Sequence, residues 1–208
     1  MSAKIKICGI TNIADGLAVV EAGADAVGFV FCEQSPRRVS IDSAAEIVRA
    51  LPPFVMKVGV FVDASVESVR RCISECGLNL LQFHGDESPD YCVQFGVMSM
   101  KAFRVRDATF LQTVQSYRTD AWLLDAFVSE KIGGTGERFN WDLAVQAREL
   151  GRPIFLAGGL TPENVQEAVR KVRPYGVDVS SGVEATPGKK DHAKVRAFVK
   201  AVKGMVGA

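Results

Sequence analysis

The sequence predicts an α/β fold, a single (β/α)8 TIM barrel that spans residues 1–208, and three observations predict it. Short apolar runs of strand length alternate with longer stretches in which apolar residues have helical spacing. The alternation occurs eight times, and glycine-rich segments follow the last two apolar runs. A length of about 200 residues is the minimum for such a barrel, and a doubly wound open sheet is the main alternative.

Eight runs rich in valine, isoleucine, leucine and phenylalanine are the predicted strands. Their nearly continuous apolar character suits parallel strands, which face the barrel interior on one side and helices on the other. The predicted strands cover residues 4–8, 26–31, 56–62, 78–83, 97–103, 121–124, 153–157 and 176–179.

Capping residues mark the predicted helices between these strands. Asn12 is expected to cap the first helix, in which Ile13, Leu17 and Val20 share one face, and Gly23 is expected to end it in a left-handed conformation.

Later helices carry similar signals. Ser40 and Ser65 are expected to cap the second and third helices, and Gly77 is expected to end the third. The pair Thr161 and Pro162 predicts a cap followed by a first-turn proline. The buried stripe expected for that last helix consists of Val165, Ala168, Val169 and Val172.

Composition excludes several classes of protein. Hydrophobic residues make up 48% of the 208 residues and charged residues 24%, so the chain can bury a core and is not disordered. Lysines and arginines total 25 and acidic residues 24, and the net charge of +1 gives no long-range attraction to nucleic acid or to an acidic membrane surface. We therefore expect a small-molecule partner, with no nucleic acid and no membrane.

The expected location is cytoplasmic. No apolar run reaches the ~18 residues that a membrane span needs, and the first residues contain no signal-peptide core. The five cysteines are odd in number and lie mostly in apolar segments, which fits reduced thiols better than a disulfide framework.

Polar residues directly after the predicted strands are the candidate site residues, because reacting groups of barrel enzymes lie at the C-terminal ends of strands. Cys8 ends the first strand, and Arg37 and Arg38 follow the second. His84 follows the fourth strand and Asp125 the sixth. A thiol, an acid and arginines are therefore expected around one mouth of the barrel.

Two small-residue loops follow the last two strands, with Gly158 and Gly159 in the first and Ser181 and Gly182 in the second. Glycines let backbone N–H groups approach a phosphate, and a helix N-terminus adds partial positive charge, so the loops predict a phosphorylated substrate. The alternative is that these residues only form tight turns. A third glycine-rich segment, residues 133–136, suits a mobile loop that closes over the ligand or a solvated turn.

Cys8 and Asp125 are the candidate acid–base groups. A cysteine at a strand end is either a small buried residue or a thiol at the mouth, and only its thiolate acts as a base. Arginines and helix ends are expected to favour that thiolate. Asp125 follows an apolar run, and apolar surroundings favour the neutral carboxyl form that a general acid needs, whereas a helix cap or a rim salt bridge is the alternative. His84 is expected to be a hydrogen-bonding residue of the rim.

The remaining cysteines predict no metal site. Cys72 and Cys76 lie four residues apart on one helix face, and no second pair or histidine stands at metal-ligand spacing. Both are interpreted as helix-face packing, and Cys32 and Cys92 are interpreted as packing residues as well.

Five collinear segments together resemble the phosphoribosylanthranilate isomerase family. They are KICGIT (6–11), GADAVGFVF (23–31), LQFHG (81–85), AGGL (157–160) and VDVSSGVE (177–184). The likeness covers essentially the whole chain. Glycine loops of this kind occur in many phosphate-binding barrels, whereas the first and last segments are specific to this family.

The resemblance implies an isomerase of tryptophan biosynthesis that uses no metal and no organic cofactor. The implied reaction is the Amadori rearrangement of N-(5'-phosphoribosyl)anthranilate to 1-(2-carboxyphenylamino)-1-deoxyribulose 5-phosphate. In this reaction an acid protonates the furanose oxygen to open the ring, and a base removes the sugar C2 proton.

The resemblance also implies residue roles. Cys8 is the general base, Asp125 is the general acid, and Arg37, with Arg38 as the alternative register, binds the anthranilate carboxylate. Asp178 is expected near the sugar. The backbone of the two small-residue loops is expected to hold the phosphate through Gly158, Gly159, Ser181 and Gly182.

Two alternative functions follow from the same fold, since a fold alone does not separate them. One is another aldose–ketose isomerase or synthase that acts on a histidine-pathway or indole-pathway intermediate, although the histidine-pathway isomerase has an aspartate where this chain has Cys8. The other is a catalytically silent barrel that binds a sugar phosphate without turnover. The oligomeric state is expected to be a monomer or a homodimer.

Overall fold

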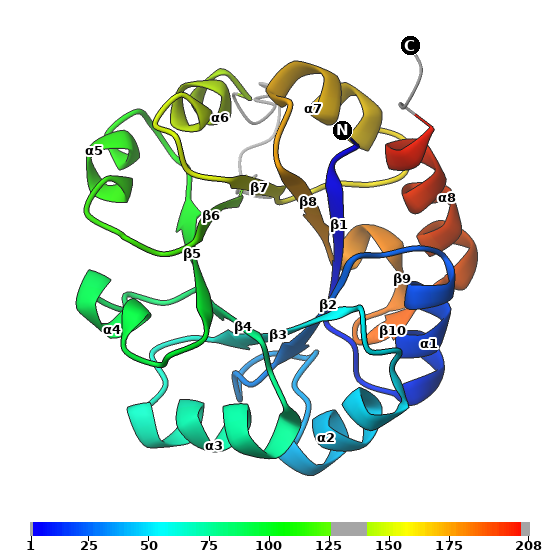
Figure 1. Ribbon diagram of the computed structural model, residues 1–208. Helices are drawn as coiled ribbons and strands as arrows, with labels where there is room; N and C mark the ends of the chain where they lie inside the picture. Colours follow the sequence, from blue (N-terminus) through cyan, green and yellow to red (C-terminus); the bar gives the residue numbers. More distant parts are fainter. Residues whose placement is uncertain (1, 126–140, 205–208) are drawn as a thin grey trace.

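Eight parallel strands close into a barrel (Figure 1), as the alternation of apolar runs predicts. The structure is a computed structural model that describes residues 2–125 and 141–204. Each strand pairs with the next one along the chain, and β8 pairs with β1 to complete the ring. The strands are β1 (Lys4–Cys8), β2 (Ala26–Val30), β3 (Met56–Phe61), β4 (Leu80–Phe83), β5 (Met98–Arg104), β6 (Ala121–Asp125), β7 (Ile154–Ala157) and β8 (Gly176–Val179).

Helices surround the ring of strands and cover its outer face (Figure 1). Two of them, α4 and α5, have only five residues each. Within the described residues, no helix combines the length and the apolar character needed to cross a membrane. The helices are α1 (Ile13–Glu21), α2 (Ile41–Ala50), α3 (Val66–Cys76), α4 (Pro89–Val93), α5 (Phe110–Val114), α6 (Trp141–Arg148), α7 (Val165–Val172) and α8 (His192–Lys203).

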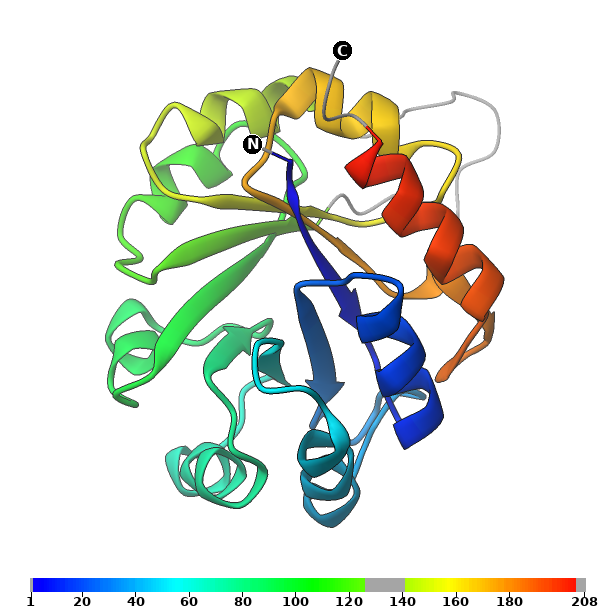
Figure 2. The ribbon, with the colours of Figure 1, turned by 45° about the vertical axis from the view of Figure 1, so that its right-hand side comes forward.

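A small hairpin follows the last barrel strand. The chain makes one turn of 3-10 helix (Ser181–Val183) and then two short antiparallel strands, β9 (Glu184–Thr186) and β10 (Lys189–Lys190). Figure 2 shows this segment, in orange, at the end of the barrel toward which the arrow of β1 points. The apolar periodicity does not predict this hairpin, because its strands are short and carry charged residues.

The predicted strands are confirmed, with every end within two residues of the observed one. The caps at Asn12, Ser40 and Ser65 are confirmed as well, since each side chain accepts a hydrogen bond from the backbone N–H three residues later. Gly77 ends α3 at a φ of 63°, and Gly23 follows α1 at a φ of 102°.

The face of α1 that carries Ile13 and Leu17 is not its buried face, because each of these side chains is 42% exposed. The opposite side of the helix packs inward instead. A Cβ atom added at Gly16 would lie 3.1 Å from Cγ2 of Ile47 on α2, so the two helices are in close contact at this glycine. Helix periodicity identifies an apolar face, and the glycine contact decides which face is buried here.

The start of α7 differs from its prediction. Thr161 begins a turn, and its carbonyl oxygen accepts hydrogen bonds from the N–H groups of Asn164 and Val165. The helix itself begins at Val165. Its predicted stripe is confirmed at three positions, which are buried, and is half-buried at the fourth; the three buried residues are Val165, Ala168 and Val172.

Alternation along each strand separates the inside of the barrel from its outside. Ile5 and Ile7 of β1 belong to the large apolar cluster that also contains Phe198 of α8, so they face the helices. Lys6 and Cys8 therefore face the barrel interior. The same alternation on the other strands decides which polar side chains reach the mouth.

Gly182→Ala is expected to destabilise the fold by about 1–3 kcal/mol, because the added Cβ atom would overlap the carbonyl oxygen of Leu160. Thermal unfolding followed by circular dichroism would report the loss as a lower Tm. Ser181→Ala, at the exposed neighbouring position, is the matched control and should keep the wild-type Tm. A wild-type Tm for Gly182→Ala would contradict the close packing of the two loops.

Candidate active site

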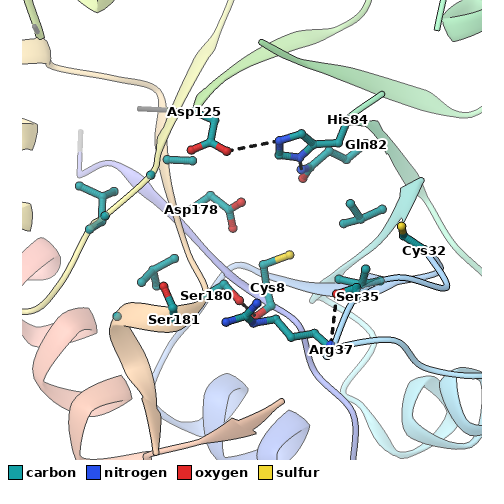
Figure 3. A pocket seen from close by; sticks show the side chains of 18 of the residues that line it. Cys8, Cys32, Ser35, Arg37, Gln82, His84, Asp125, Asp178, Ser180 and Ser181 are labelled. Atoms are coloured by element: carbon teal, nitrogen blue, oxygen red, sulfur yellow. Dashed lines mark hydrogen bonds and ion pairs between the residues drawn. The ribbon is translucent and has the colours of Figure 1, made fainter. Parts of the chain in front are cut away.

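A pocket of about 760 Å³ opens at the C-terminal ends of the barrel strands (Figure 3). This volume is in the range of small-molecule sites. The pocket brings together the candidate site residues of the sequence except Arg38, and these are Cys8, Arg37, His84, Asp125, Gly158, Gly159, Asp178, Ser181 and Gly182.

Strand alternation explains why side chains far apart in sequence meet in this pocket. Cys8 is the last residue of β1, Asp125 is the last residue of β6, and both occupy inward-facing positions. Asp178 faces inward from β8, and His84 directly follows β4. In Figure 3, Cys8 and Asp178 point toward the middle of the pocket, between the Asp125–His84 pair on one side and Arg37 on the other.

The Cys8 thiol lies at the base of the pocket and is 8% exposed. Burial raises the pKa of this thiol, the positive charges of Lys6 and Lys190 oppose that rise, and the carboxylate of Asp178 adds to it. The largest effect that lowers the pKa of Cys8 therefore comes from Lys6, two residues earlier on the same strand. The sequence pointed to arginines and helix ends for this role.

Asp125 is paired with a histidine. Nε2 of His84 lies 3.3 Å from Oδ2 of Asp125, and Nε2 of Gln82 lies 3.1 Å from Nδ1 of His84. The Asp125 side chain is 27% exposed and forms an ion-pair contact at the rim, which is the alternative that the sequence left open beside apolar surroundings. His84 lies at the rim and forms hydrogen bonds there, as predicted.

Arg37 points into the pocket, whereas Arg38 points away from it. Nε and Nη2 of Arg37 donate to Oε1 and Oε2 of Glu184 at 2.9 and 2.7 Å, a two-point contact that fixes the plane of the guanidinium. Arg38 instead pairs with the exposed Glu33 at 3.0 Å. Of the two registers left open by the sequence, only Arg37 lines the pocket.

Glu184 and Lys190 hold the pocket-lining Arg37 in place, and no sequence pattern indicated either of them. Nζ of Lys190 donates to Oε1 of Glu184 at 2.9 Å, and the two side chains are 0% and 5% exposed. Burial by itself would raise the pKa of Glu184, but hydrogen bonds from Arg37 and Lys190 hold it below its usual value. Glu184 lies 147 residues from Arg37 in the chain, and no local pattern indicates a pairing over that separation.

The two small-residue loops lie side by side at the mouth. Gly158 and Gly159 have φ angles of 84° and 65°, a left-handed backbone that favours glycine. Gly182 approaches the carbonyl oxygen of Leu160, so a side chain at position 182 would collide with the neighbouring loop. Because α7 begins only at Val165, the loops themselves, and not the first turn of that helix, border the pocket.

The packing interpretation holds for Cys72, Cys76 and Cys92, which are buried, and burial raises the pKa values of their thiols to about 12, 11 and 12. Cys32 is half-buried, packs against the cluster of Cys8, Val30 and Val60, and in addition lines the pocket just beyond the end of β2. The glycine-rich segment 133–136, expected as a closing loop or a turn, lies outside the described residues. Among residues 2–125 and 141–204, no group of three or more histidine, cysteine or acidic residues could hold a metal ion.

The fold and the pocket define a (β/α)8-barrel enzyme with a thiol and a carboxyl group facing one cavity at the C-terminal mouth. Residues 5–201 match the family model of N-(5'-phosphoribosyl)anthranilate (PRA) isomerase. The chain belongs to this family, whose members are isomerases of tryptophan biosynthesis.

Known proteins of the family resemble the chain over nearly its full length. The N-(5'-phosphoribosyl)anthranilate isomerase of Geotalea uraniireducens is 54% identical over 202 residues, which cover 97% of this chain and 99% of that protein. A crystal structure of a phosphoribosylanthranilate isomerase in complex with reduced 1-(o-carboxyphenylamino)-1-deoxyribulose 5-phosphate is 43% identical, with a TM-score of 0.89 over 98% of this chain and 100% of that one. A structure of monomers generated from the dimeric isomerase of Thermotoga maritima is 41% identical, with a TM-score of 0.88 and the same coverage.

Glu184→Gln is expected to make the stability of the protein less sensitive to acid. Because the folded-state pKa of Glu184 is lowered, its ionised form stabilises the fold above its unfolded-state pKa of about 4.3, and this contribution is lost as the pH falls through the lower folded-state pKa. Tm values at about pH 7 and about pH 3.5 measure the effect, and the wild type should lose more Tm between them than the variant does. Equal losses would mean that Glu184 is not ionised in its buried pair.

Proposed function

We propose that the pocket converts N-(5'-phosphoribosyl)anthranilate to 1-(2-carboxyphenylamino)-1-deoxyribulose 5-phosphate. The observation that carries the proposal is the meeting of Cys8 and Asp125 in one cavity with the two small-residue loops and Arg37. This arrangement offers one base, one acid and separate places for the two anionic ends of the substrate. The complex of a 43% identical family member with the reduced form of this product supports the assignment.

The two anionic ends of the substrate bind to different groups of the pocket. The phosphate lies against the backbone of Gly158, Gly159, Ser181 and Gly182, where N–H groups can approach an oxygen closely. The anthranilate carboxylate accepts hydrogen bonds from the N–H groups of Arg37 that Glu184 leaves free. The apolar wall of Val30, Val60 and Cys32 packs against the aromatic ring.

The acid and the base act in sequence on the sugar. Asp125 protonates the furanose ring oxygen, the ring opens, and the anthranilate nitrogen becomes part of a Schiff base. The Cys8 thiolate then takes the proton from C2, and the enamine that forms becomes the ketone. His84, whose Nε2 lies 3.3 Å from Oδ2 of Asp125, orients the acid, and Asp178 lies beside the sugar. Because substrate and product are isomers, the reaction consumes no oxidant or reductant.

The test is the loss of anthranilate-type fluorescence when the purified protein meets freshly prepared phosphoribosylanthranilate. Wild-type protein should remove the signal faster than the substrate breaks down spontaneously.

Cys8→Ser should retain substrate binding and lose at least about a hundredfold in kcat, because general-base catalysis contributes roughly 10²–10⁴ in rate and a hydroxyl group is a far poorer base than a thiolate. Asp125→Asn should show the same separation of kcat from binding. Full turnover in Cys8→Ser would remove Cys8 from the mechanism, and an effect of Asp125→Asn on binding alone would place the acid elsewhere.

For the assembly, we propose a homodimer formed through the N-terminal face of the barrel. A cavity of about 360 Å³ opens on that face. Three apolar side chains at its edge are exposed to solvent, with Phe54 at 101%, Tyr175 at 54% and Met98 at 43%. A fully exposed phenylalanine beside an apolar cavity is typical of an interaction surface, and the 41% identical isomerase of Thermotoga maritima is dimeric. We further propose that residues 1–208 act as a single catalytic domain in the cytoplasm.

Phe54→Glu is expected to convert the dimer to a monomer, because a charge would then have to be buried in the apolar contact. Light scattering coupled to size-exclusion chromatography should give twice the 22.5-kDa chain mass for wild type and a single chain mass for the variant. Val93→Glu, at a position that is 48% exposed on α4, is the matched control and should leave the dimer intact. A monomeric wild type, or a dimeric Phe54→Glu variant, would contradict the proposed interface.

A further inference from the structure

A lysine lies inside the barrel, where the acid–base steps above assign it no role. The side chain of Lys6 is 1% exposed and points inward from β1, two residues before Cys8 and on the same side of the strand. Burying a charged group costs free energy unless partners compensate it. The partners of Lys6 therefore indicate what the charge is doing there.

One partner is a carboxylate on the neighbouring strand. Lys6 and Asp178 are register partners across the β1–β8 pairing, and Nζ of Lys6 donates to Oδ1 of Asp178 at 2.9 Å. Asp178 is 9% exposed and lines the pocket. The ammonium group is thus held inside the barrel by a carboxylate that lines the pocket.

The second partner is the Cys8 thiol, whose pKa the charge of Lys6 lowers. A Cβ atom built at Gly28, on the adjacent strand β2, would lie 2.8 Å from Sγ of Cys8 and 3.2 Å from Nζ of Lys6. Both groups therefore occupy the space that the missing side chain of residue 28 leaves open. Gly28 is also the register partner of Cys8, so the backbone fixes this arrangement.

We propose that Lys6 is a positioning residue whose ammonium group orients and stabilises the thiolate of Cys8, while Asp178 holds the ammonium in place. The inference rests on the proposed function, in which Cys8 is the base. When the thiolate takes the C2 proton, the C–H electron pair forms the C1–C2 double bond and the iminium pair moves to nitrogen. Sulfur passes from charged to neutral in this step, and Lys6 is the cation that stabilises its charged form beforehand.

Several other ionisable groups surround the sulfur or line the same pocket, and they determine how the thiol titrates. Arg37 and Lys190 are positive but share Glu184 as their acidic partner. Within residues 2–125 and 141–204, these charged and titratable neighbours are Lys6 on β1, Cys32 and Arg37 after β2, His84 after β4, Asp125 on β6, Asp178 on β8, Glu184 on β9 and Lys190 on β10.

The charges of Lys6 and its neighbours act in opposite directions on the thiol. Burial lowers the pKa of Lys6, but Asp178 and Cys8 together raise it above its usual value, so the lysine stays charged at neutral pH. Lys6 lowers the pKa of the Cys8 thiol, and Asp178 raises it. Removing the lysine and removing the carboxylate should therefore shift the titration of Cys8 in opposite directions, which a merely structural role would not do.

The test measures the alkylation of Cys8 by iodoacetamide as a function of pH, without substrate, with peptide mass spectrometry reading the modification at Cys8 itself. Lys6→Met should lower the alkylation rate at pH 7 at least tenfold, which corresponds to a pKa rise of about one unit. Asp178→Asn should raise the rate at pH 7. The pH profile of kcat/KM should shift in the same two directions.

Lys101→Met is the matched control, because Lys101 is a second buried lysine with an acidic partner, Glu87 at 3.1 Å, but lies on the outward face of β5. It should lower Tm without moving the alkylation profile. If Lys6→Met does not fold, adding the same change to Asp178→Asn removes both charges together and should slow alkylation relative to Asp178→Asn alone.

An unchanged Cys8 profile in a folded Lys6→Met variant, or shifts of the same sign for Lys6→Met and Asp178→Asn, would overturn the inference. The proposed function fails differently, through a wild-type protein that does not turn over phosphoribosylanthranilate. The two failures are distinguishable because the alkylation experiment contains no substrate.

Discussion

The pairing of β8 with β1 is the constraint on which the rest of the structure depends. Once the ring of strands is closed, every strand residue faces either the helices or the barrel interior. Ile5 and Ile7 then pack with the helices, and Lys6 and Cys8 have only the interior to occupy. Closure also makes Asp178, near the end of the chain, the register partner of Lys6 near its start. The chemistry of the mouth is thus a direct result of ring closure.

Charge pairing organises the mouth that closure creates. Three carboxylates there have a nitrogen partner, with Lys6 beside Asp178, Arg37 beside Glu184 and His84 beside Asp125. Buried charges are tolerated when they are paired and hydrogen-bonded. The hairpin after β8 supplies both Glu184 and Lys190, so a short addition to the barrel fixes the guanidinium of Arg37 beside it. The pocket is therefore held in shape largely before any ligand enters.

The barrel could be predicted from the sequence because strand and helix periodicity are local properties of the chain. Several pocket-lining residues could also be predicted, since strand ends such as Cys8 and Asp125 can be located from the apolar runs alone. Pairings between distant residues could not be predicted, because Glu184 and Arg37 are 147 residues apart and only the folded chain brings them together. Lys6 carried a usable signal, as it lies two residues before Cys8 and therefore on the same side of a strand. Which face of α1 is exposed could not be predicted from the sequence, because the close contact between Gly16 and α2 determines which face is buried.

Gly28 links the choice of base to the shape of the barrel. Glycine has no side chain, and the sulfur of Cys8 and the ammonium group of Lys6 occupy the space where a side chain of residue 28 would lie. A bulkier base in place of Cys8 would find no further room on β2 and would have to push Lys6 aside or lift toward the opening. Redesign of this barrel for another aldose–ketose substrate therefore has to change positions 6, 8 and 28 together, because a larger side chain at one position requires a smaller one at another.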